Sequence, residues 1–520
     1  MTEPRTVDAV IRLRAGTEGD KPMVVDPTSR IGYTELENRS RTLAAGFVNA
    51  GVAKGTRVGL IMPNGAQWVL IALALTRIGA VLVPLSTLLA ARELAEQLRV
   101  ASVQYVITVP QFRGHHHLAK LQEMASDLPA LREVWTDDEA AALPVDHAAR
   151  GLVDALCRAV TPSDPMAIIF TSGSSAAPKG VIHSHGNALS AVASGLSARC
   201  IGRDTRLYLP MPFFWVGGFG AGILSALSAG ATLITEPIPE PARTLRLLER
   251  ERVTLFRGWP DQADVLARHQ YSVGADLSAL RPGSLEALLP ADMRAAPGAR
   301  ASLFGMTETF GPYCGFPADS DMPRTAWGSC GKPFAGMTVR IVDTDHRTTL
   351  PAGEVGEIEV RGPHLMRGIC RRSREQVFTT DGYYRTGDLG YLDSAGYLFS
   401  RGRSDDMFKV NGATVYPAEV VQGLRDIDGV RAAFATDVAG AQGGKEVGAV
   451  VVCDTAVHDV GKLRAAAKSV LSSFKIPTVW LLSDTDAIVP RGPTGKVDTR
   501  RLRELLATTP IATLQGESHD

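Results

Sequence analysis

Short apolar runs alternate with helix-period stretches over the first part of the chain. The segments RVGLIM, AVLVPL and QYVITV are rich in β-branched residues, whereas Glu35 to Ala50 and Trp68 to Ile78 repeat apolar residues every three or four positions. Strands that alternate with helices in this way are typical of parallel sheets built from βαβ units. We therefore predict an α/β subdomain over residues 31–110.

The same alternation returns between residues 165 and 310, where the expected strands are AIIF, RLYLPM, ATLIT and TLFRGWP. This repetition predicts a second doubly wound α/β subdomain. Residues 111–160 are rich in Ala and Asp and are expected to form connecting helices and loops. Residues 337–400 place Gly turns between short alternating strands, which predicts a small β-barrel.

A smaller α+β domain is expected after residue 403, with strands AAFATDV and EVGAVVVC between helices. The charged segment Arg403 to Asp406 precedes it. We place the domain boundary there. The predicted fold is therefore a large α/β domain at 1–403 and a small α+β lid at 404–520.

Composition narrows the class of protein. A chain of 520 residues with 45% hydrophobic content exceeds the size of one core, so at least two domains are expected. Acidic and basic residues number 55 each, which gives no basic surface for nucleic acid. The six cysteines lack CxxC spacing, and no apolar run approaches the ~20 residues that span a bilayer. We expect a soluble cytoplasmic protein that binds no membrane.

The strongest functional signal is IIFTSGSSAAPKGVIHSHGN, residues 168–187, which predicts an apolar strand, a loop of hydroxyl and small residues, and a helix start. Backbone N–H groups and hydroxyls in such a loop can hold phosphate oxygens. The loop is not a Walker A motif, because Pro178 precedes Lys179 and no Ser or Thr follows it. The candidate phosphate-binding residues are Thr171, Ser172, Gly173, Ser174, Ser175 and Lys179.

Two further segments carry residues suited to a nucleotide and a metal ion. In LFGMTETFG, Phe304 can stack on a base, Thr307 can bond a phosphate, and Glu308 can offer a hard oxygen ligand to Mg²⁺. In YYRTGDLG, Asp388 lies in a Gly-flanked turn and can accept hydrogen bonds from two ribose hydroxyls. These side chains are the candidate nucleotide and metal ligands.

Two C-terminal segments complete an ordered set: SRGRSDDMFKVNGATVYPAEV, and VPRGPTGKVDTR, which presents Lys496. In this order the segments resemble the adenylate-forming superfamily of acyl-CoA synthetases, peptide synthetase adenylation domains and luciferases. The resemblance extends from about Tyr33 to Lys496. It implies that ATP activates a carboxylic acid to an acyl-adenylate, with release of pyrophosphate, and that the acyl group then passes to the thiol of coenzyme A.

The resemblance also implies roles for single residues. Lys496 bridges the substrate carboxylate and the phosphate, and Arg403 contacts ribose or phosphate. Asp405 is the hinge about which the lid rotates between the half-reactions. Lys409 either stabilises the adenylate or caps its strand, and Gly412 leaves bare backbone beside the pantetheine tunnel. The implied partners are a small carboxylic acid, ATP or AMP, coenzyme A and Mg²⁺; the oligomeric state, a homodimer included, is left open.

The segments MPFFWVGGFG and GSLEALLPADM are candidates for the acyl pocket. Aromatic rings next to glycines suit a hydrophobic or aryl acid, although they are equally compatible with packing under the sheet. The stretch lacks the Asp that amino-acid-activating domains commonly place there. The candidate pocket residues are Phe213, Phe214, Trp215, Gly217, Gly218 and Leu285.

Four positions depart from the family pattern. Ala176 replaces a Gly of the phosphate loop, Leu285 and Glu286 replace two glycines, and Trp215 replaces a His often found at the gate of the pocket. An Ala where φ must be positive costs on the order of 1 kcal/mol, and added bulk and negative charge disfavour a triphosphate. A ligase that only forms thioesters from preformed acyl-adenylate is therefore a second candidate function. A stand-alone adenylation domain that loads a carrier protein is a third, and a nucleotide-binding regulator without turnover is a fourth.

Overall fold

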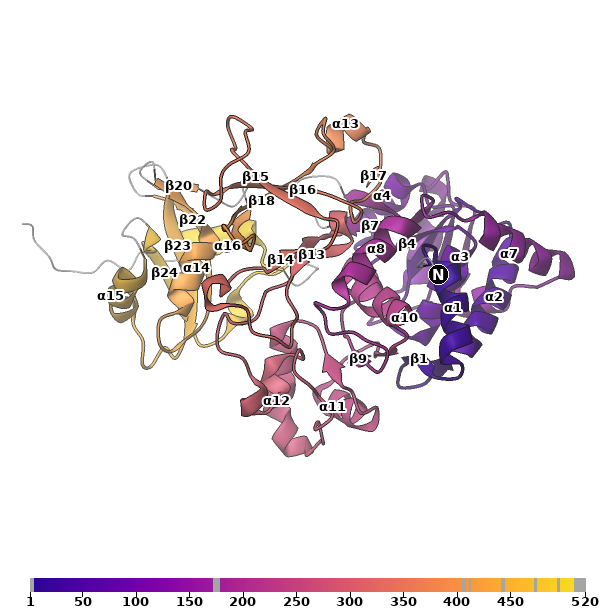
Figure 1. Cartoon of the computed structure of the whole chain (residues 1–520), viewed down its shortest axis with the longest axis horizontal. Helices are drawn as coiled ribbons and strands as arrows, with labels where there is room; N and C mark the ends of the chain where they lie inside the picture. Colours follow the sequence, from indigo (N-terminus) through magenta and orange to yellow (C-terminus); the bar gives the residue numbers. More distant parts are fainter. Residues whose placement is uncertain are drawn as a thin grey trace, which may run out of the picture. The chain divides into compact units, whose positions relative to one another are not determined.

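The computed structural model describes residues 4–171, 178–403, 408–410, 413–440, 445–471, 475–492 and 496–508. These residues form two compact units (Figure 1). Unit 1 consists of Met1–Val339, Val360–Tyr384 and Ala395–Leu398, and unit 2 of Arg340–Glu359, Arg385–Ser394 and Phe399–Asp520. Unit 2 thus contains the predicted lid, residues 404–520, together with parts of strands that precede it in the chain. The boundary at Arg403 to Asp406 falls largely outside the described residues and stays a prediction.

The larger sheet of unit 1 has the strand order β17-β8-β7-β4-β3-β5-β6. Strands β7, β4, β3, β5 and β6 run parallel, whereas β8 is antiparallel to β7 and β17 is antiparallel to β8. The bounds of the strands are β3 (Arg57–Ile61), β4 (Val81–Pro84), β5 (Tyr105–Thr108), β6 (Glu133–Thr136), β7 (Pro165–Thr171), β8 (Lys179–Ser184) and β17 (Gly368–Ile369).

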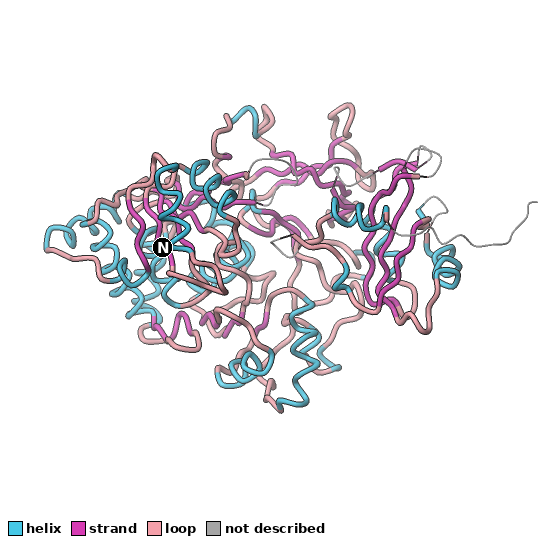
Figure 2. Tube along the Cα trace, turned by 180° about the vertical axis from the view of Figure 1, so that it is seen from behind, coloured by secondary structure: helices cyan, strands magenta, loops and turns pink. Residues whose placement is uncertain are grey.

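Both faces of this sheet are buried, because alternate residues of a strand point to opposite sides. Leu82 and Ile169 belong to a hydrophobic cluster around Trp68, whereas Val83 and Phe170 belong to a second cluster on the other face. Figure 2 shows the strands of this part of the chain flanked by helices. The predicted α/β subdomain is confirmed. The covering helices are α2 (Tyr33–Asn49), α3 (Ala66–Arg77), α4 (Ala91–Ala101) and α8 (His185–Gly195).

The second sheet of unit 1 has the order β11-β9-β10-β1-β2, parallel except for β2. The sequence pattern assigned this layer to residues 165–310, but two of its strands come from the N-terminal part of the chain, and β7 and β8 belong to the first sheet. Sheet neighbours are chosen by matching buried faces, which the order of strands along the chain does not reveal. The bounds are β1 (Pro22–Val25), β2 (Arg30–Gly32), β9 (Arg206–Tyr208), β10 (Thr232–Ile234) and β11 (Leu255–Phe256), with α11 (Pro241–Arg250) and α12 (Pro260–Val273) beside them.

The phosphate-loop motif contains one strand more than expected. The sequence predicted a strand, a loop and a helix start over residues 168–187; α8 does begin in this segment, at His185, but Lys179–Ser184 form β8 before it. The apolar residues Val181 and Ile182 continue the sheet opposite β7, so the loop connects a β-hairpin. Ser184 and Asn187 then cap α8 reciprocally, with Ser184 N donating to Asn187 Oδ1 at 2.6 Å.

The remaining elements of unit 1 are mostly short. Residues 111–160 form the expected connecting helices together with edge strand β6. The helices are α1 (Val7–Glu18), α5 (His117–Met124), η1 (Ala125–Asp127), α6 (Asp137–Ala141), α7 (His147–Ala159), α9 (Val216–Gly218), η2 (Phe219–Leu224), α10 (Ser225–Ala229), η3 (Glu286–Leu288), η4 (Ala291–Met293), η5 (Thr307–Thr309), η6 (Arg324–Ala326) and α13 (Arg374–Val377). A three-stranded antiparallel sheet contains β12 (Phe304–Met306), β13 (Gly311–Gly315) and β14 (Lys332–Pro333).

Residues 337–400, predicted as a small β-barrel, form a four-stranded sheet in the order β15-β16-β18-β19. Its strands are β15 (Thr338–Val342), β16 (Gly356–Arg361), β18 (Tyr384–Leu392) and β19 (Leu398–Arg403). The C-terminal part of unit 2 is an α+β fold whose sheet β22-β23-β24 packs on helices. It contains β20 (Phe408–Val410), β21 (Ala413–Val415), α14 (Pro417–Arg425), β22 (Val430–Ala439), β23 (Lys445–Cys453), α15 (Val460–Val470), β24 (Val479–Ser483), η8 (Asp486–Ile488) and α16 (Thr499–Ala507).

Helix length and apolar character decide whether a segment can span a membrane. Within the described ranges, no helix combines enough length with enough apolar character to cross a bilayer.

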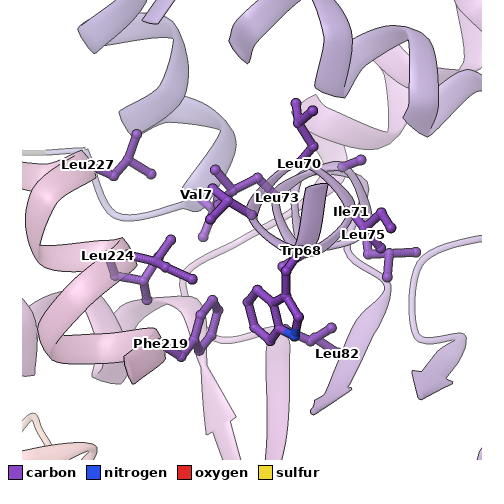
Figure 3. Close-up of a cluster of buried hydrophobic side chains, with 14 of the residues drawn as sticks. Val7, Trp68, Leu70, Ile71, Leu73, Leu75, Leu82, Phe219, Leu224 and Leu227 are labelled. Carbon is purple, nitrogen blue, oxygen red and sulfur yellow. The ribbon is translucent and has the colours of Figure 1, made fainter. Parts of the chain in front are cut away.

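Trp68 lies at the centre of the larger core of unit 1. Its ring contacts Phe213 and Phe219 edge-on, with centroids 5.3 and 5.8 Å away, and Figure 3 shows Phe219 and Leu224 packed around it. Replacement by Ala leaves a large cavity, so we expect Trp68→Ala to lower the free energy of unfolding by about 3–5 kcal/mol. Urea denaturation followed by circular dichroism measures this loss.

Leu152→Ala is the matched control, because this side chain is 53% exposed. It is expected to change the free energy of unfolding by less than about 0.5 kcal/mol. An equally small effect of Trp68→Ala would contradict the packing described for this core.

Candidate active site

The base of the predicted phosphate loop lies at the end of the hairpin β7–β8. Thr171 and Lys179 are directly paired across the two strands, and both side chains are half-buried. The loop residues predicted to bind phosphate, Ser172, Gly173, Ser174 and Ser175, and the departure Ala176 lie outside the described residues. The structure therefore places the two residues that flank the loop.

The segment Phe304 to Thr309 forms the second part of the candidate site. Phe304 is half-buried on β12, and its ring contacts Tyr313 with centroids 5.7 Å apart. The following Gly305 is required by packing, since a Cβ there would lie 2.2 Å from Gly311 O. This close contact between β12 and β13 fixes the backbone that leads into Thr307 and Glu308.

Glu308 is 8% exposed, which is unusual for a carboxylate. The hydroxyl of Tyr384 donates to Oε1 at 3.0 Å. Its Oε2 makes no hydrogen bond to a described residue. A nearly buried carboxylate with one oxygen left over is suited to a cation, because burial without a counter-charge is costly.

The chain around β17 ties Glu308 to the phosphate-loop hairpin. Met366 N donates to Glu308 O at 2.8 Å, and Cys370 N donates to Gly180 O at 2.8 Å. Between them, Gly368 and Ile369 pair with β8. The strand that begins at Lys179 and the turn that carries Glu308 are thus both fixed to one short segment, residues 366–370.

Hydrogen bonds between buried polar side chains also connect the segments of the candidate site. Asn187 Nδ2 donates to His183 Nδ1 at 2.9 Å and to His364 O at 3.1 Å. The other end of this network is a 2.9 Å hydrogen bond between Ser194 Oγ and His364 Nε2. The network connects β8, α8 and the chain before β17 through neutral groups.

Burial lowers the pKa of His183 to about 3, and the neighbouring Thr307 backbone and the Asn187 side chain oppose this shift only in part. Burial likewise lowers the pKa of His364 to about 4, with a further contribution from the charge of Arg199. Both imidazoles are neutral near pH 7. They therefore position the backbone of the candidate site without adding charge to it.

Unit 2 brings together two of the predicted nucleotide ligands. Asp388 is half-buried on β18, and Arg403 at the end of β19 approaches it with Nη1 3.3 Å from Oδ1. Gly387, which precedes Asp388, has φ +72°, and a Cβ there would lie 2.8 Å from the Arg403 guanidinium. Asp388 also has its backbone N bonded to Thr386 Oγ1 at 3.0 Å. The predicted Gly-flanked turn is thus part of a strand with one left-handed residue.

Lys496 is exposed in unit 2, and its backbone oxygen accepts from Gly492 N at 2.8 Å, which closes the loop that carries it. Lys409 lies on β20, in the strand pair with β21. The predicted hinge Asp405 and the predicted tunnel residue Gly412 lie outside the described residues. Their roles stay predictions.

The candidate acyl-pocket residues divide into two groups. Phe213 is fully buried against Trp68, which favours core packing for this side chain. Trp215 is half-buried, and its ring contacts Trp259 with centroids 5.8 Å apart. Phe214 is nearly buried and contacts Trp215.

The two glycines of this segment have a packing reason of their own. A Cβ on Gly218 would lie 2.1 Å from Pro212 O, and one on Gly217 would lie 2.7 Å from Met211 Sδ. The turn around Phe213 is therefore too tight for a side chain at position 218, whereas at position 217 the flexible side chain of Met211 would have to move.

Leu285 and Glu286 are both engaged within their own region. Leu285 packs against the hydrophobic cluster around Phe256, and Leu285 N donates to Phe256 O at 3.0 Å. Glu286 is exposed, and its Oε1 accepts from Ala295 N at 3.3 Å. Leu285 therefore contributes to a hydrophobic cluster, and the Glu286 carboxylate is neither buried nor without a hydrogen-bond partner.

Metal ligands are few. Over the ranges that the structure describes, no group of three or more His, Cys, Asp or Glu side chains is arranged to hold a metal ion. A site with one protein carboxylate is still compatible with Mg²⁺, which commonly binds one or two carboxylates together with substrate phosphates. Glu308 is the carboxylate that fits this description.

Several residues of the site were not singled out from the sequence. Tyr384 lies in the same motif as Asp388, and His183 and Asn187 lie in the phosphate-loop motif, but only the structure shows their contacts. The one sequence signal was the presence of His183 and His185 within an apolar strand and helix start, where polar residues need partners.

Comparisons with known proteins show the family of the chain. The sequence profile of a family described as AMP-binding enzyme matches residues 11–370. A Mycobacterium tuberculosis propanoyl:CoA ligase whose acyl group carries a 7a-methyl-1,5-dioxo-octahydro-indenyl substituent is 33% identical, over 96% of this chain and 99% of the relative. A feruloyl-CoA synthase of Amycolatopsis is 30% identical over 90% and 93%.

Solved structures show the same fold. That of an anthranilate CoA ligase in complex with anthranoyl-AMP superimposes with a TM-score of 0.79 at 21% identity, over 96% of this chain and 97% of that one. The predicted α/β fold class is confirmed by this similarity.

The neutral state of His364 makes stability depend on pH. The unfolded chain binds a proton on this residue near pH 6.5, whereas the folded chain binds it only near pH 4. The unfolded state therefore holds more protons between these values, and stability falls as the pH falls, by up to about 1.4 kcal/mol per pH unit. We expect His364→Gln to make the unfolding free energy less dependent on pH in this window.

Urea denaturation at a series of pH values measures the slope. His269→Gln serves as the control, since His269 is exposed on α12, and it should leave the slope as in the parent protein. An unchanged slope for His364→Gln would contradict a buried neutral imidazole at this position.

Proposed function

The chain belongs to the AMP-binding enzyme family and is an acid–thiol ligase, and on that premise we propose that it converts a hydrophobic carboxylic acid to an acyl-CoA thioester through an acyl-adenylate. The observation that carries the proposal is similarity to CoA ligases over nearly the whole length of both chains. The arrangement around Glu308 supports it, because it offers one carboxylate oxygen to a cation beside Thr307.

In the first half-reaction, a carboxylate oxygen of the acid attacks the α-phosphorus of ATP, the bond to the β-phosphate oxygen breaks, and pyrophosphate leaves. Both reactants are anions, so positioning and charge neutralisation supply most of the catalysis. In the proposal, the loop that begins at Thr171 holds phosphate oxygens through its N–H and hydroxyl groups. Lys179 and Lys496 contribute mobile positive charge.

Mg²⁺ fits the residues present, although they supply a single carboxylate. Glu308 would hold the ion through Oε2, with substrate oxygens completing its shell. When bound, Mg²⁺ neutralises charge on the phosphates. In the proposal, the chain keeps Oε2 available for the ion. Tyr384 binds the other carboxylate oxygen, Oε1, and Met366 N holds the backbone oxygen of Glu308.

Candidate ligands for the nucleoside are present in each unit. Phe304 of unit 1 offers a half-buried ring for the base. In unit 2, Asp388 is an acceptor for ribose hydroxyls, and Arg403, already 3.3 Å from that carboxylate, orients it and offers charge to ribose or phosphate oxygens.

In the second half-reaction, the thiol sulfur of coenzyme A attacks the acyl carbon, the bond to the AMP oxygen breaks, and the thiol proton is released. We propose that the lid, residues 404–520, turns about Asp405 between the two steps. Lys496 then leaves the site, and the strand with Lys409 and Gly412 takes its place, with bare backbone beside the pantetheine arm.

The acid is proposed to be hydrophobic and cyclic. Two of the relatives, the propanoyl:CoA ligase with the indenyl substituent and the feruloyl-CoA synthase, act on acids with ring systems. In this chain the edge-on pair Trp215 and Trp259 offers an aromatic surface after the C-terminal ends of β9 and β11, the edge at which parallel sheets bind ligands. An apolar ring of the acid suits such a surface.

The competing functions gain no support. A ligase limited to thioester formation was suggested by Ala176, Leu285 and Glu286; of these, Leu285 packs into a hydrophobic cluster and Glu286 is exposed with its carboxylate hydrogen-bonded. A carrier-loading adenylation domain and a regulator without turnover have no observation in their favour. A cytoplasmic location and a homodimer stay predictions.

The two half-reactions can be measured separately. Pyrophosphate exchange into ATP reports adenylation, and thioester formation from supplied acyl-AMP reports the second step. We expect Lys496→Ala to lower the exchange rate at least about 100-fold, because a charge at the transition state is lost. Thioester formation from acyl-AMP is expected to change only a few-fold.

Lys462→Ala is the matched control, since this lysine is exposed on α15, where it pairs with Asp459 and donates to Val457 O. It should leave both rates as in the parent protein. Equal losses in both half-reactions for Lys496→Ala would contradict the proposed role. Absence of exchange in the parent protein, with thioester formation intact, would favour a ligase limited to thioester formation.

A further inference from the structure

Unit 1 contains a buried guanidinium that no carboxylate among the described residues compensates. Arg199 follows α8 and is 5% exposed. Its Nη2 donates to Val192 O at 3.0 Å, while its Nε has no hydrogen-bond partner among the described residues. An Arg in such a position normally pairs with an acid, because burial of an unpaired charge is costly.

A second guanidinium lies on the same side of the smaller sheet. Arg257 directly follows β11, its backbone N donates to Tyr208 O, and its Nη1 donates to Gly283 O at 2.7 Å. Along β11, Leu255 packs in the Trp68 cluster and Phe256 in the opposite cluster. Strand alternation therefore directs Arg257 to the face of Leu255, where α8 also packs.

The loop after Arg281 connects the two arginines. Arg281 Nη2 donates to the backbone oxygen of Cys200, the neighbour of Arg199, at 2.9 Å. Gly283, whose backbone oxygen holds Arg257, is so close to Cys200 that a Cβ would lie 3.3 Å from its Sγ. The residue that follows Arg199 and the side chain of Arg257 therefore both contact one short loop, residues 281–283.

Electrostatics agrees with this geometry. Burial and the positive charge of Arg257 lower the pKa of Arg199 to about 10, so the two groups repel each other across low-dielectric surroundings. Burial also lowers the pKa of Arg257. Within the described part of the chain, neither forms an ion pair with Asp or Glu. His364, neutral near pH 7, faces Arg199 from the chain before β17.

The position of the pair relates it to the acid. Arg257 lies two residues before Trp259, whose ring contacts Trp215. The aromatic pair and Arg257 thus follow the C-terminal ends of neighbouring strands, β9 and β11. Arg257, two residues from this aromatic surface along the chain, has no carboxylate partner among the described residues.

We infer that Arg199 and Arg257 form a subsite for a second oxygen function of the acid, a carbonyl or carboxylate remote from the reacting carboxylate. The inference rests on the proposed function and names a property of its substrate. Guanidinium groups donate strong hydrogen bonds to such oxygens, and a ligand oxygen relieves the repulsion between the two charges. An acid without that oxygen leaves the donors unpaired.

The test uses three acids matched in ring and chain: cyclohexylpropanoate, its ring-ketone analogue and its ring-carboxylate analogue. Acyl-CoA formation with ATP, Mg²⁺ and coenzyme A gives kcat/KM for each. The full-length parent protein is expected to prefer at least one oxygen-bearing acid over the plain acid by about tenfold or more. The ketone and carboxylate arms distinguish which oxygen function is recognised.

Arg257→Met is expected to abolish this preference, and Arg257→Lys to restore part of it for the carboxylate. Arg199→Met should have the same effect as Arg257→Met. Because the readout is a ratio between acids, a general loss of activity does not imitate the effect. Arg243→Met, on an Arg side chain that is 87% exposed at the start of α11, is the control and should keep the ratio of the parent protein.

Two results would overturn the inference. One is a parent protein that converts the plain acid as well as both analogues; the other is a preference that survives in Arg257→Met. Both leave the proposed function in place. Inactivity of the parent protein toward all three acids, in pyrophosphate exchange as well as thioester formation, would instead count against the proposed acid class and the inference with it.

Discussion

The side-chain amide of Asn187 joins three segments of unit 1 that lie far apart in the sequence. Its oxygen accepts from Ser184 N and so caps α8, while its nitrogen donates to His183 on β8 and to His364 O, 177 residues away. A buried amide is stable only when these partners are present together. The phosphate-loop hairpin, helix α8 and the chain that leads to β17 are therefore fixed relative to one another by a single satisfied group.

The position of Glu308 depends on this frame. The segment 366–370, which follows His364, holds the backbone of Glu308 and the strand β8 at once. The neighbouring His183 and His364 are neutral near pH 7. Among the described residues, the hydroxyl of Tyr384 is the hydrogen-bond donor to the Glu308 carboxylate. Among the described residues no Lys, Arg or His pairs with this carboxylate, and a carboxylate of low exposure attracts a cation more strongly than an exposed one does.

Unit 1 also holds positive charge at Arg199, which is buried, and at Arg257, which is half-buried. Among the described residues, neither these two guanidinium groups nor the Glu308 carboxylate forms an ion pair. Protein interiors rarely retain such charges unless a ligand completes them. The two sets of charges are consistent with a substrate that brings phosphate and metal to one end and oxygen acceptors to the other.

Much of the fold can be predicted from local patterns, because buried parallel strands are continuous apolar runs in the sequence. The run AVLVPL contains β4, and the run QYVITV contains β5. The pairing of distant segments did not follow. Nothing near Pro22–Val25 shows that it lies beside β10, and the bond between Tyr384 and Glu308 joins residues 76 positions apart. Motif residues were found by type and spacing, whereas Arg199 and Arg257 became visible only with their burial and missing partners.

The central claim is that a carboxylate oxygen of the substrate attacks the α-phosphorus of ATP before the thiol reacts. Acid labelled with oxygen-18 in its carboxylate tests this directly, with mass spectrometry of the nucleotide released after acyl-CoA formation. The account predicts AMP that carries one labelled oxygen. Unlabelled AMP, or ADP together with labelled inorganic phosphate, would contradict it.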